Sequence, residues 1–338
     1  MSKRPTIHAV AALAGVSTAT VSKVINQITV GVADPTRQRV EAAIRQLGYR
    51  PNRVGRGLRT LRRSIVGMAI VDPSPRFLAD PFTTNLVAGL TNHLSSHGFG
   101  LLLHGVKPRE LRSSFLVRES EADALCVMLS GSRRERIGYM RLLAELGQPF
   151  VAFQDLPVAS IEDACFVRQA DRAGAATLAE HLLKRRPRRA AMVISDVSWP
   201  AAEQRVNGLQ TVLQSNGVVL DLVSCDETRT EAIVSAVNGY LDRSGLPDLV
   251  IGLNDQIALA AIQVLRGRGL RIPGDVGVSG FNAFQFAGFA NPRLTTVRSP
   301  AYELGQVGAE IILDRLEAGG FRKKEQVIPV ELVPGDSA

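Results

Sequence analysis

A run of small polar side chains near the N-terminus has the spacing to form hydrogen bonds along one face of a helix. The positions on that face are Thr18, Ala19, Ser22, Lys23 and Asn26. Val21, Val24 and Ile25 recur between them and form an apolar stripe that a small core would bury. Hydroxyl, amide and ammonium groups in this arrangement suit the base edges and phosphates of the ~12 Å wide major groove of DNA. The alternative is the solvated face of an ordinary amphipathic helix.

Positive charge is concentrated in the same part of the chain. The formal net charge is +8, but residues 1–63 carry twelve Lys or Arg against only Asp34 and Glu41. The remaining residues are therefore slightly acidic as a group. A segment with such an excess of positive charge favours a polyanionic partner.

Three short helices are expected to position the polar face. Thr6 and Ser17 are suitable N-cap residues for a first helix and for a second over 18–26, and Gly15 ends the first helix. Asp34 followed by proline supplies a cap and a first residue for a third helix, which Gly48 closes. The pattern is that of a helix-turn-helix, with a plain helical bundle as the alternative.

From residue 64 onward, short apolar runs alternate with amphipathic segments, which favours α/β architecture with parallel sheets covered on both faces. Strands are expected over 65–71, 100–104, 124–129, 150–153, 190–194, 249–253 and 276–281. Helices between them include 83–97, 133–146, 173–185 and 204–216. Two doubly wound units of this kind would form a ligand cleft at the carboxyl ends of their strands.

Enzymatic chemistry has no motif to support it. The sequence lacks G-x-G-x-x-G, G-x-x-x-x-G-K-[ST], G-x-S-x-G and H-E-x-x-H. Its 3 cysteines are too widely separated for a disulfide framework or a zinc site. No run approaches the ~20 apolar residues of a membrane span. We therefore expect a cytoplasmic protein that is not an enzyme and that uses no cofactor or metal.

The segment over residues 6–26, followed by Leu47-Gly48-Tyr49-Arg50-Pro51-Asn52, resembles the headpiece of the lactose-repressor/galactose-repressor family. The resemblance continues through residues 247–248, 254–259, 280–282, 292–297 and 304–305 and so covers nearly the whole chain. It implies a helix-turn-helix headpiece over 1–50, a hinge helix over 51–63 and a periplasmic-binding-protein-like type I core. We expect one core subdomain over 64–162 plus 292–324 and the other over 163–291 plus 325–338.

The function that the resemblance implies is regulation of transcription in response to a ligand. We expect a repressor of carbohydrate-related genes that binds a palindromic DNA operator as a homodimer. A small-molecule effector in the cleft would change operator affinity by shifting the population of lobe arrangements. The chain ends without leucine heptads, which favours a dimer over a tail-joined tetramer. The alternative is a small-molecule-binding or catalytic α/β protein whose basic headpiece binds DNA only nonspecifically.

Carried over position by position, the resemblance implies DNA contacts by Thr6, Ser17, Thr18, Ala19, Thr20, Ser22, Lys23, Asn26, Asn52, Arg53, Gly55, Arg56, Leu58 and Arg59. Thr18 and Ala19 are too short for bidentate bonds, so we expect thymine-methyl or water-mediated contacts, with Lys23 reaching a guanine or a phosphate. Leu58 matches the hinge leucine that wedges into the minor groove. Gly55 and Gly57 each cost about 1 kcal/mol of helix stability, which predicts a hinge that is more disordered than usual off DNA.

For the effector, the resemblance implies contacts by Asp80, Phe82, Gln154, Asp171, Arg205, Asn254, Asp255 and Asn282. Arg205 matches an arginine that clamps the ligand, with a surface arginine as the alternative, and Asp171 and Asp255 have helix capping as theirs. Gln154 and Asn282 stand where aspartate is common in the family. A cleft with less negative charge, with Arg205 and with Arg76 or Arg168 nearby, favours a sugar acid or sugar phosphate over a neutral sugar.

Overall fold

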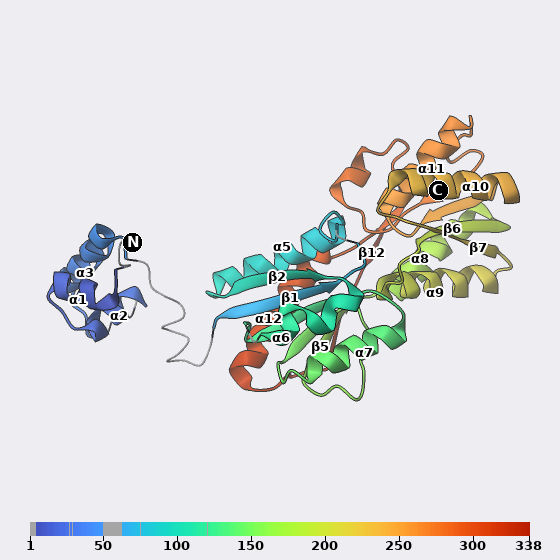
Figure 1. The fold of residues 1–338 in the computed structure, drawn as a ribbon. Coiled ribbons are helices and arrows are strands. Elements are labelled where there is room, and N and C mark those ends of the chain that lie inside the picture. Colours follow the sequence, from blue (N-terminus) through green and yellow to red (C-terminus); the bar gives the residue numbers. More distant parts are fainter. Residues whose placement is uncertain (1–4, 27, 29, 50–62, 75, 120) are drawn as a thin grey trace. The chain divides into compact units, whose positions relative to one another are not determined.

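The computed structural model describes residues 5–26, 28, 30–49, 63–74, 76–119 and 121–338. These fall into two units, Met1–Arg63 and Ser64–Ala338 (Figure 1). We call the first unit the headpiece and the second the core.

The headpiece contains α1 (Ile7–Ala14), α2 (Thr18–Ile25) and α3 (Asp34–Leu47). The predicted caps of the first two helices are confirmed: Thr6 Oγ1 accepts from the amide of Ala9, and Ser17 Oγ accepts from the amide of Thr20. Gly15 and Gly48 end α1 and α3 with φ of 64° and 59°, the left-handed region that glycine tolerates. The predicted cap at Asp34 is wrong by one residue, because Ala33 is the N-cap of α3. The buried residues are Val10, Ala11, Ala14, Val21, Val24, Val40 and Ala43.

The first lobe of the core is a six-stranded parallel sheet in the order β11-β5-β4-β3-β1-β2. Its strands are β1 (Ile65–Val71), β2 (Gly100–Val106), β3 (Ala124–Leu129), β4 (Phe150–Phe153), β5 (Ala164–Gln169) and β11 (Glu325–Ile328). Its helices are α5 (Pro81–Ser96), α6 (Phe115–Arg118), α7 (Arg133–Ala144) and α12 (Ala301–Ala318), with a 3-10 turn η1 (Pro108–Ser113).

Both faces of this sheet are buried. Alternate residues of β1 point to opposite sides, so that Val66 and Met68 pack with α5 and α12 whereas Ala69 packs with α7 and α6. Helices α5 and α12 approach each other at two glycines. A Cβ added to Gly89 would lie 1.9 Å from the carbonyl oxygen of Tyr302, and one added to Gly305 would lie 2.0 Å from that of Leu86. Only glycine allows this backbone contact.

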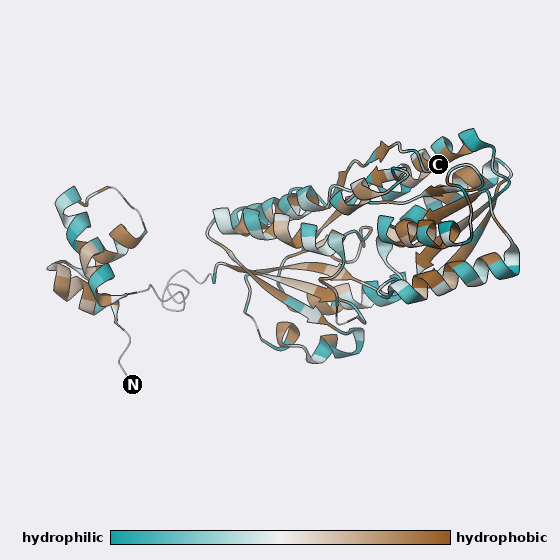
Figure 2. Cartoon of the chain, turned by 90° about the horizontal axis from the view of Figure 1, so that it is seen from above, coloured by the Kyte–Doolittle hydropathy of each residue, from teal (hydrophilic) through white to brown (hydrophobic). Residues whose placement is uncertain are grey.

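The second lobe has a four-stranded parallel sheet in the order β7-β6-β8-β9. Its strands are β6 (Arg189–Ser195), β7 (Val219–Cys225), β8 (Leu249–Gly252) and β9 (Gly277–Ser279). Its helices are α8 (Asp171–Leu182), α9 (Pro200–Ser215), α10 (Thr230–Ser244) and α11 (Asp255–Gly267), with the 3-10 turns η2 (Leu183–Arg185) and η3 (Gln285–Phe289). Figure 2 shows hydrophobic strands between helices whose outer faces are hydrophilic.

The chain passes between the lobes three times: after β5, through β10 (Thr296–Arg298), and through β12 (Glu331–Val333) after β11. β10 and β12 pair antiparallel. The predicted subdomain boundaries at 162/163 and 324/325 are therefore wrong by one strand each, because β5 and β11 pair with each other in the first sheet. Neither strand was predicted from the sequence, because Arg168 and Gln169 interrupt the apolar pattern of β5, and Glu325 and Gln326 interrupt that of β11.

Among the described residues, no single helix is long and apolar enough to cross a membrane. Helices α1 and α2 satisfy that test of length and composition only when they are taken together, and they are bent by 103° where they meet.

Candidate functional site

The exposed face of α2 carries the side chains that the sequence placed there. Ala19, Lys23 and Asn26 are exposed, and Thr18 and Ser22 are partly exposed. Val21 and Val24 are buried on the opposite face. The face therefore has small side chains that allow close approach, together with a single cation at the end of the helix.

Hydrogen bonds within this face hold its polar groups in place. Ser17 Oγ and Thr20 Oγ1 are 3.0 Å apart, and Asn26 Nδ2 donates to Ser22 Oγ at 3.3 Å. Thr6 and Ser17 are exposed at the N-termini of the two helices, where unpaired backbone amides favour an anion such as a phosphate. The predicted DNA contacts at Asn52, Arg53, Gly55, Arg56, Leu58 and Arg59 lie outside the described residues.

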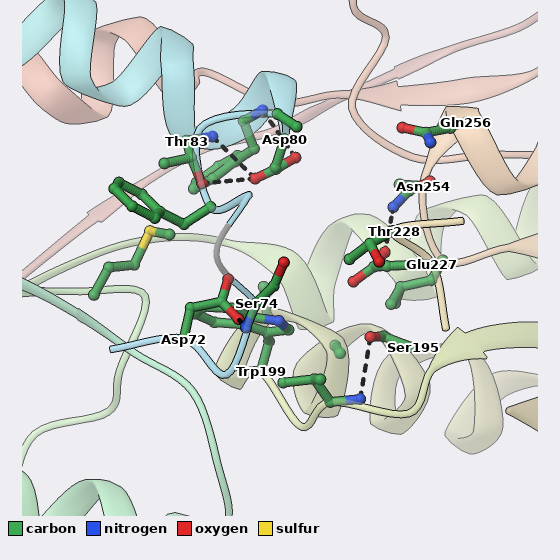
Figure 3. Close-up of a pocket in the computed structure, with 18 of the residues that line it drawn as sticks. Asp72, Ser74, Asp80, Thr83, Ser195, Trp199, Glu227, Thr228, Asn254 and Gln256 are labelled. Atoms are coloured by element: carbon green, nitrogen blue, oxygen red, sulfur yellow. Dashed lines mark hydrogen bonds between the residues drawn. The ribbon is translucent and has the colours of Figure 1, made fainter. Parts of the chain in front are cut away.

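A cleft lies between the two lobes of the core at the carboxyl ends of their strands, where the sequence predicted it (Figure 3). Its volume is about 220 Å³, which is small beside the ~300–1,000 Å³ of typical sites for drug-sized ligands. Six of the eight predicted effector residues line it, namely Asp80, Phe82, Gln154, Arg205, Asn254 and Asn282.

The start of α5 supplies the first-lobe wall of the cleft. Asp80 is the N-cap of this helix, and its carboxylate accepts from the amides of Phe82 and Thr83 at 3.2 and 3.0 Å and from Thr83 Oγ1 at 2.7 Å. Pro81 is the first helical residue, where its missing N–H has no consequence. Figure 3 shows Asp80 and Thr83 on one side of the cleft, opposite Glu227 and Asn254.

Gln154 has an unused hydrogen-bond donor in the cleft wall. The residue is 5% exposed, and its φ of 66° lies in the left-handed region, which is rare for a side chain of this size. Gln154 Oε1 accepts from the amide of Gln169 at 3.0 Å. Nε2 has no hydrogen-bond partner among the described residues. A buried donor left without a partner costs about 1–3 kcal/mol, so this one is suited to an acceptor on a ligand.

Arg205 is buried, at 5% exposure, and fixed by three groups, so the surface alternative for this residue is wrong. Nε donates to Asp171 at 2.7 Å, Nη1 to the carbonyl of Leu253 at 2.8 Å and Nη2 to Asn282 Oδ1 at 3.0 Å. The guanidinium also lies 3.8 Å from the centroid of the Phe281 ring. Its charge is therefore largely neutralised by the protein itself.

Asp171 and Asp255 do not line the cleft. Asp171 is 2% exposed and serves as the ion-pair partner of Arg205; burial raises its pKa although Arg205 opposes the shift. Asp255 accepts from Thr296 Oγ1 at 2.5 Å and from the amide of Phe284 at 3.3 Å. Neither is a helix cap, since Ala170 and Asn254 hold the N-cap positions of α8 and α11.

The cleft is acidic even though Gln154 and Asn282 stand where the family often has aspartate. The side chains of Asp72, Asp80, Asp196, Asp226 and Glu227 all line it, against Arg76 and Arg205. Burial, and secondarily repulsion from Asp80, raises the pKa of Asp72, and both effects also raise that of Glu227. The other suggested cation, Arg168, instead pairs with Glu325 at 2.5 Å on the neighbouring strand and does not line the cleft. An anionic ligand would meet repulsion here.

The sequence analysis did not identify the cleft residues that come directly after the strands β1, β6 and β7. Asp72 follows β1, Ser195 and Asp196 are at the end of β6, and Asp226 and Glu227 follow β7. The rule that ligands bind at the carboxyl ends of parallel strands identifies these positions once the strands are known. Trp199, which also lines the cleft, is the 1 tryptophan of the chain. Its ring adds an apolar surface to a cleft that is otherwise rich in polar groups.

Comparison with known proteins gives matches at both ends of the chain. The model of the family described as "Bacterial regulatory proteins, lacI family" matches residues 6–52, and that of the "Periplasmic binding protein-like domain" matches residues 179–338. The HTH-type transcriptional regulator CelR of Thermobifida fusca is 32% identical over 98% of this chain and 96% of its own length.

Among solved structures, several resemble the whole chain. A complex of the transcriptional regulator CelR with cellobiose has a TM-score of 0.70 at 29% identity and covers 99% of this chain and 100% of that one. A lac repressor dimer bound to operator and the anti-inducer ONPF has a TM-score of 0.83 at 24% identity, with 99% of each chain covered. The second likeness establishes the headpiece-plus-two-lobe fold.

Proposed function

This chain belongs to the lacI family of bacterial regulatory proteins, and from that premise we propose that it is a ligand-responsive repressor of carbohydrate-related genes. The observation that carries the proposal is the pairing of an exposed polar helix face in the headpiece with an acidic cleft in the core that contains an unused donor. The first suits DNA, and the second suits a ligand rich in hydroxyl groups.

On DNA, α2 is proposed to enter the major groove. Thr18 and Ala19 contact thymine methyls or act through water, and Lys23 donates to a guanine or a phosphate. Thr6, Ser17, Thr20, Ser22 and Asn26 contact the backbone or support those that do. Leu58 of the hinge expected over residues 51–63 is proposed to wedge into the minor groove.

We propose a homodimer on a palindromic operator. Two copies related by a two-fold axis present two α2 helices to two equivalent half-sites. Strand β7 is at one edge of the second sheet, and Val219 and Leu222 on it are 58% and 50% exposed. Exposed apolar side chains on an open sheet edge favour aggregation of a monomer, and a second copy of the chain would cover them.

The ligand is proposed to be a neutral sugar. The five cleft carboxylates are acceptors for hydroxyl donors, Gln154 Nε2 is a donor for a ring or hydroxyl oxygen, and Trp199 offers a ring face. The complex of CelR with cellobiose supports this class. Calorimetry should detect glucose or cellobiose but not gluconate or glucose 6-phosphate; tight binding of the anionic pair alone would contradict the proposal.

The ligand is proposed to act by population shift between lobe arrangements. A ligand that contacts both walls of the cleft favours one arrangement, and the spacing of two headpieces in a dimer follows from it. The coupling is reciprocal, so an effector that weakens operator binding is itself bound less tightly by the DNA complex.

Operator selection tests the DNA half of the proposal. A random duplex library is enriched on the purified full-length protein, and binding of the recovered sequence is measured across a salt series. We expect a palindrome, a steep salt dependence, and for Lys23→Ala weaker binding with a salt slope lower by about 1.

The matched control is Arg134→Ala, which removes one exposed cation from α7 in the core. It should leave both affinity and slope unchanged. Failure to enrich any sequence would support the alternative, a ligand-binding or catalytic protein whose headpiece binds DNA only nonspecifically.

A further inference from the structure

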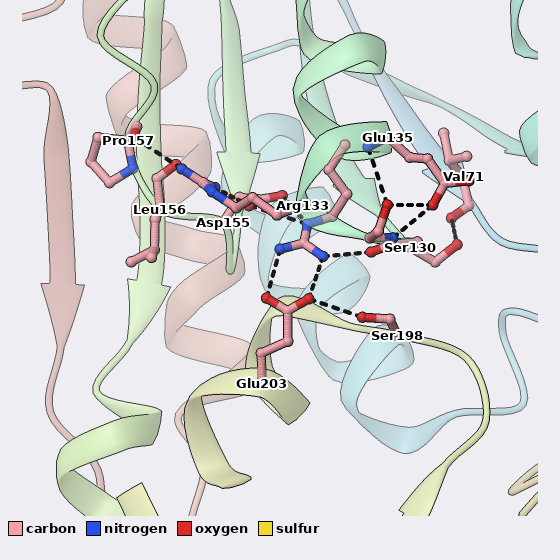
Figure 4. A network of polar contacts seen from close by, with 12 residues as sticks. Val71, Ser130, Arg133, Glu135, Asp155, Leu156, Pro157, Ser198 and Glu203 are labelled. Carbon is pink, nitrogen blue, oxygen red and sulfur yellow. Dashed lines mark hydrogen bonds and ion pairs between the residues drawn. The ribbon is translucent and has the colours of Figure 1, made fainter. Parts of the chain in front are cut away.

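Arg136 of the first lobe reaches across to the second lobe through a bidentate ion pair with Glu203, which Figure 4 labels. It lies on α7 and its side chain is 1% exposed. Its Nη1 and Nη2 donate to Oε1 and Oε2 of Glu203 at 2.8 and 3.0 Å. Glu203 lies in the first turn of α9. Two parallel charge-assisted bonds of this kind fix orientation as well as distance.

The guanidinium of Arg136 is also anchored within its own lobe. Nε donates to Asp155 Oδ2 at 3.0 Å, and Nη1 donates to the carbonyl of Gly131 at 2.5 Å. Arg133 donates to the other oxygen of Asp155 at 2.8 Å. Opening of the lobes would therefore leave Arg136 in place and break its contact with Glu203.

The second-lobe partner is held by a neighbouring pair of contacts. Ser198 Oγ donates to Glu203 Oε1 at 2.9 Å, and the Ser198 carbonyl accepts from the amide of Gly131 at 2.8 Å. Arg136 and Ser198 together hold the pKa of Glu203 below its ordinary value, although burial opposes them. Glu203 is thus charged at neutral pH, and the ion pair is intact there.

The ion pair adjoins the second-lobe wall of the cleft. Trp199 and Ala202 line the cleft just before Glu203, and Arg205 lines it just after. Arg136 and Glu203 are not themselves among the lining residues. With the lobes in contact, the side chain of Glu203 is 34% exposed and that of Arg136 is 1% exposed. Separation of the lobes would break both charge-assisted bonds between them. Separation is therefore unfavourable.

We propose that Arg136 and Glu203 are positioning residues that hold the N-terminal end of α9 against the first lobe and maintain the lobe arrangement that binds the ligand. The positioning is a property of the ligand-free protein. Its consequence for effector affinity rests on the proposed function, because apparent affinity falls in proportion to the fraction of molecules in the binding-competent state.

Fluorescence of Trp199 reads this arrangement directly, since the chain has 1 tryptophan and it lines the cleft. In ligand-free full-length protein, Glu203→Gln should increase acrylamide quenching of Trp199 at least twofold and speed amide exchange in residues 198–206. Arg136→Lys keeps the charge but loses the planar fork, and should act in the same direction. The matched control is Glu231→Gln, an exposed glutamate in the first turn of α10, which should change neither signal.

The proposal is overturned if Glu203→Gln behaves like Glu231→Gln in both measurements. It is also overturned if exchange speeds up equally throughout the second lobe, which would reveal a general loss of structure instead of a local one. If Arg136→Lys fails to fold, Glu203→Gln still decides the matter, because that side chain is one-third exposed and carries no buried charge of its own.

Affinity is measured separately, with cellobiose as the probe. Glu203→Gln should raise its apparent Kd about tenfold while Glu231→Gln leaves it unchanged. If Glu203→Gln increases quenching of Trp199 but leaves the Kd for cellobiose unchanged, then the ion pair positions the lobes without affecting ligand binding, and the proposed link between the two is refuted. Absence of any sugar response in the unmodified protein would count against the proposed function, and the ligand-free quenching result would stand independently of it.

Discussion

The exposed face of α2 takes all its side chains from residues 18–26, whereas the cleft takes its own from segments as far apart as Asp72 and Asn282. The helix face consists of exposed groups on a small apolar core, and each can change without leaving a buried charge behind. The cleft rests on buried ions such as Arg205 and Asp171, which are held by one another. Substitutions should therefore act locally in the headpiece and cooperatively in the core.

Arg205→Ala should give the largest effect. It leaves Asp171 buried without its ion-pair partner, which typically costs about 3–5 kcal/mol of stability. It also removes one of the side chains that line the cleft. Urea unfolding of the core, followed by Trp199 fluorescence, measures the loss. The exposed neighbour Arg172→Ala is the control and should change the free energy of unfolding by less than about 0.5 kcal/mol. Equal midpoints for the two variants would show that the buried ion pair does not stabilise the core.

Asp255 should give a pH-dependent effect of up to about 3 kcal/mol. Burial raises the pKa of this carboxyl from 3.8 to about 6. The folded state then binds its proton more tightly than the unfolded state, so the contribution of Asp255 to stability falls as pH rises from 3.8 to 6 and is constant above.

The measurement is the difference in free energy of unfolding between Asp255→Asn and the unmodified protein at several pH values. The variant should become relatively more stable as pH rises through this window. A constant difference for Asp255→Asn would show that folding does not raise the pKa of this carboxyl.

The headpiece and the cleft differ in how far the sequence predicted them. The headpiece was predictable because its caps, glycine ends and apolar stripe are local signals, as Thr6, Ser17 and Gly15 show. Strands β1, β3 and β4 were predicted with the bounds observed, because each is a buried apolar run. Strand β7 was missed, since Asp221 and Ser224 interrupt its pattern at a sheet edge.

The charge of the cleft was predictable only in part. Asp72 directly follows β1, whose bounds were predicted, but the acids that follow the missed strand β7 could not be placed. Asp226 and Glu227 follow β7, and without that strand nothing places them beside Asp80. At two positions where the family often has aspartate, this chain has Gln154 and Asn282, which indicated a loss of negative charge. Acidic residues from other segments, such as Asp226 and Glu227, supply negative charge instead. Similarly, Asp171 and Asp255 looked like ligand contacts or caps by position, and only the packing shows that they contact Arg205 and Thr296.

Gln154→Glu should weaken binding of a neutral sugar about tenfold, as expected for losing one buried hydrogen bond to the ligand. The change keeps the acceptor for the Gln169 amide and replaces the unused donor with an acceptor. Titration with cellobiose, followed by Trp199 fluorescence, measures it. Gln256→Glu adds the same charge at an exposed position of the same cleft, so a matching loss there would assign the effect to charge alone.

Ser17→Ala should have the smallest effect, about 1 kcal/mol on the stability of the headpiece. It removes the oxygen that accepts from the amide of Thr20 at the start of α2. Amide exchange of α2 in the full-length protein should quicken about fivefold, with the core unchanged. Ser17→Asp retains an acceptor and should restore protection; acceleration in the core as well would show that the two units are not energetically separate.

The position of β11 sets an order for folding during synthesis. All four strands of the second sheet lie within residues 189–279, so that sheet can be completed while the C-terminal segment is still being made. The first sheet begins with β1 yet cannot be completed until β11 pairs with β5, and α5 lacks its glycine contact until α12 emerges. The sheet whose first strand is translated first is therefore the later of the two to gain all its strands, and β5 remains an open strand edge until then.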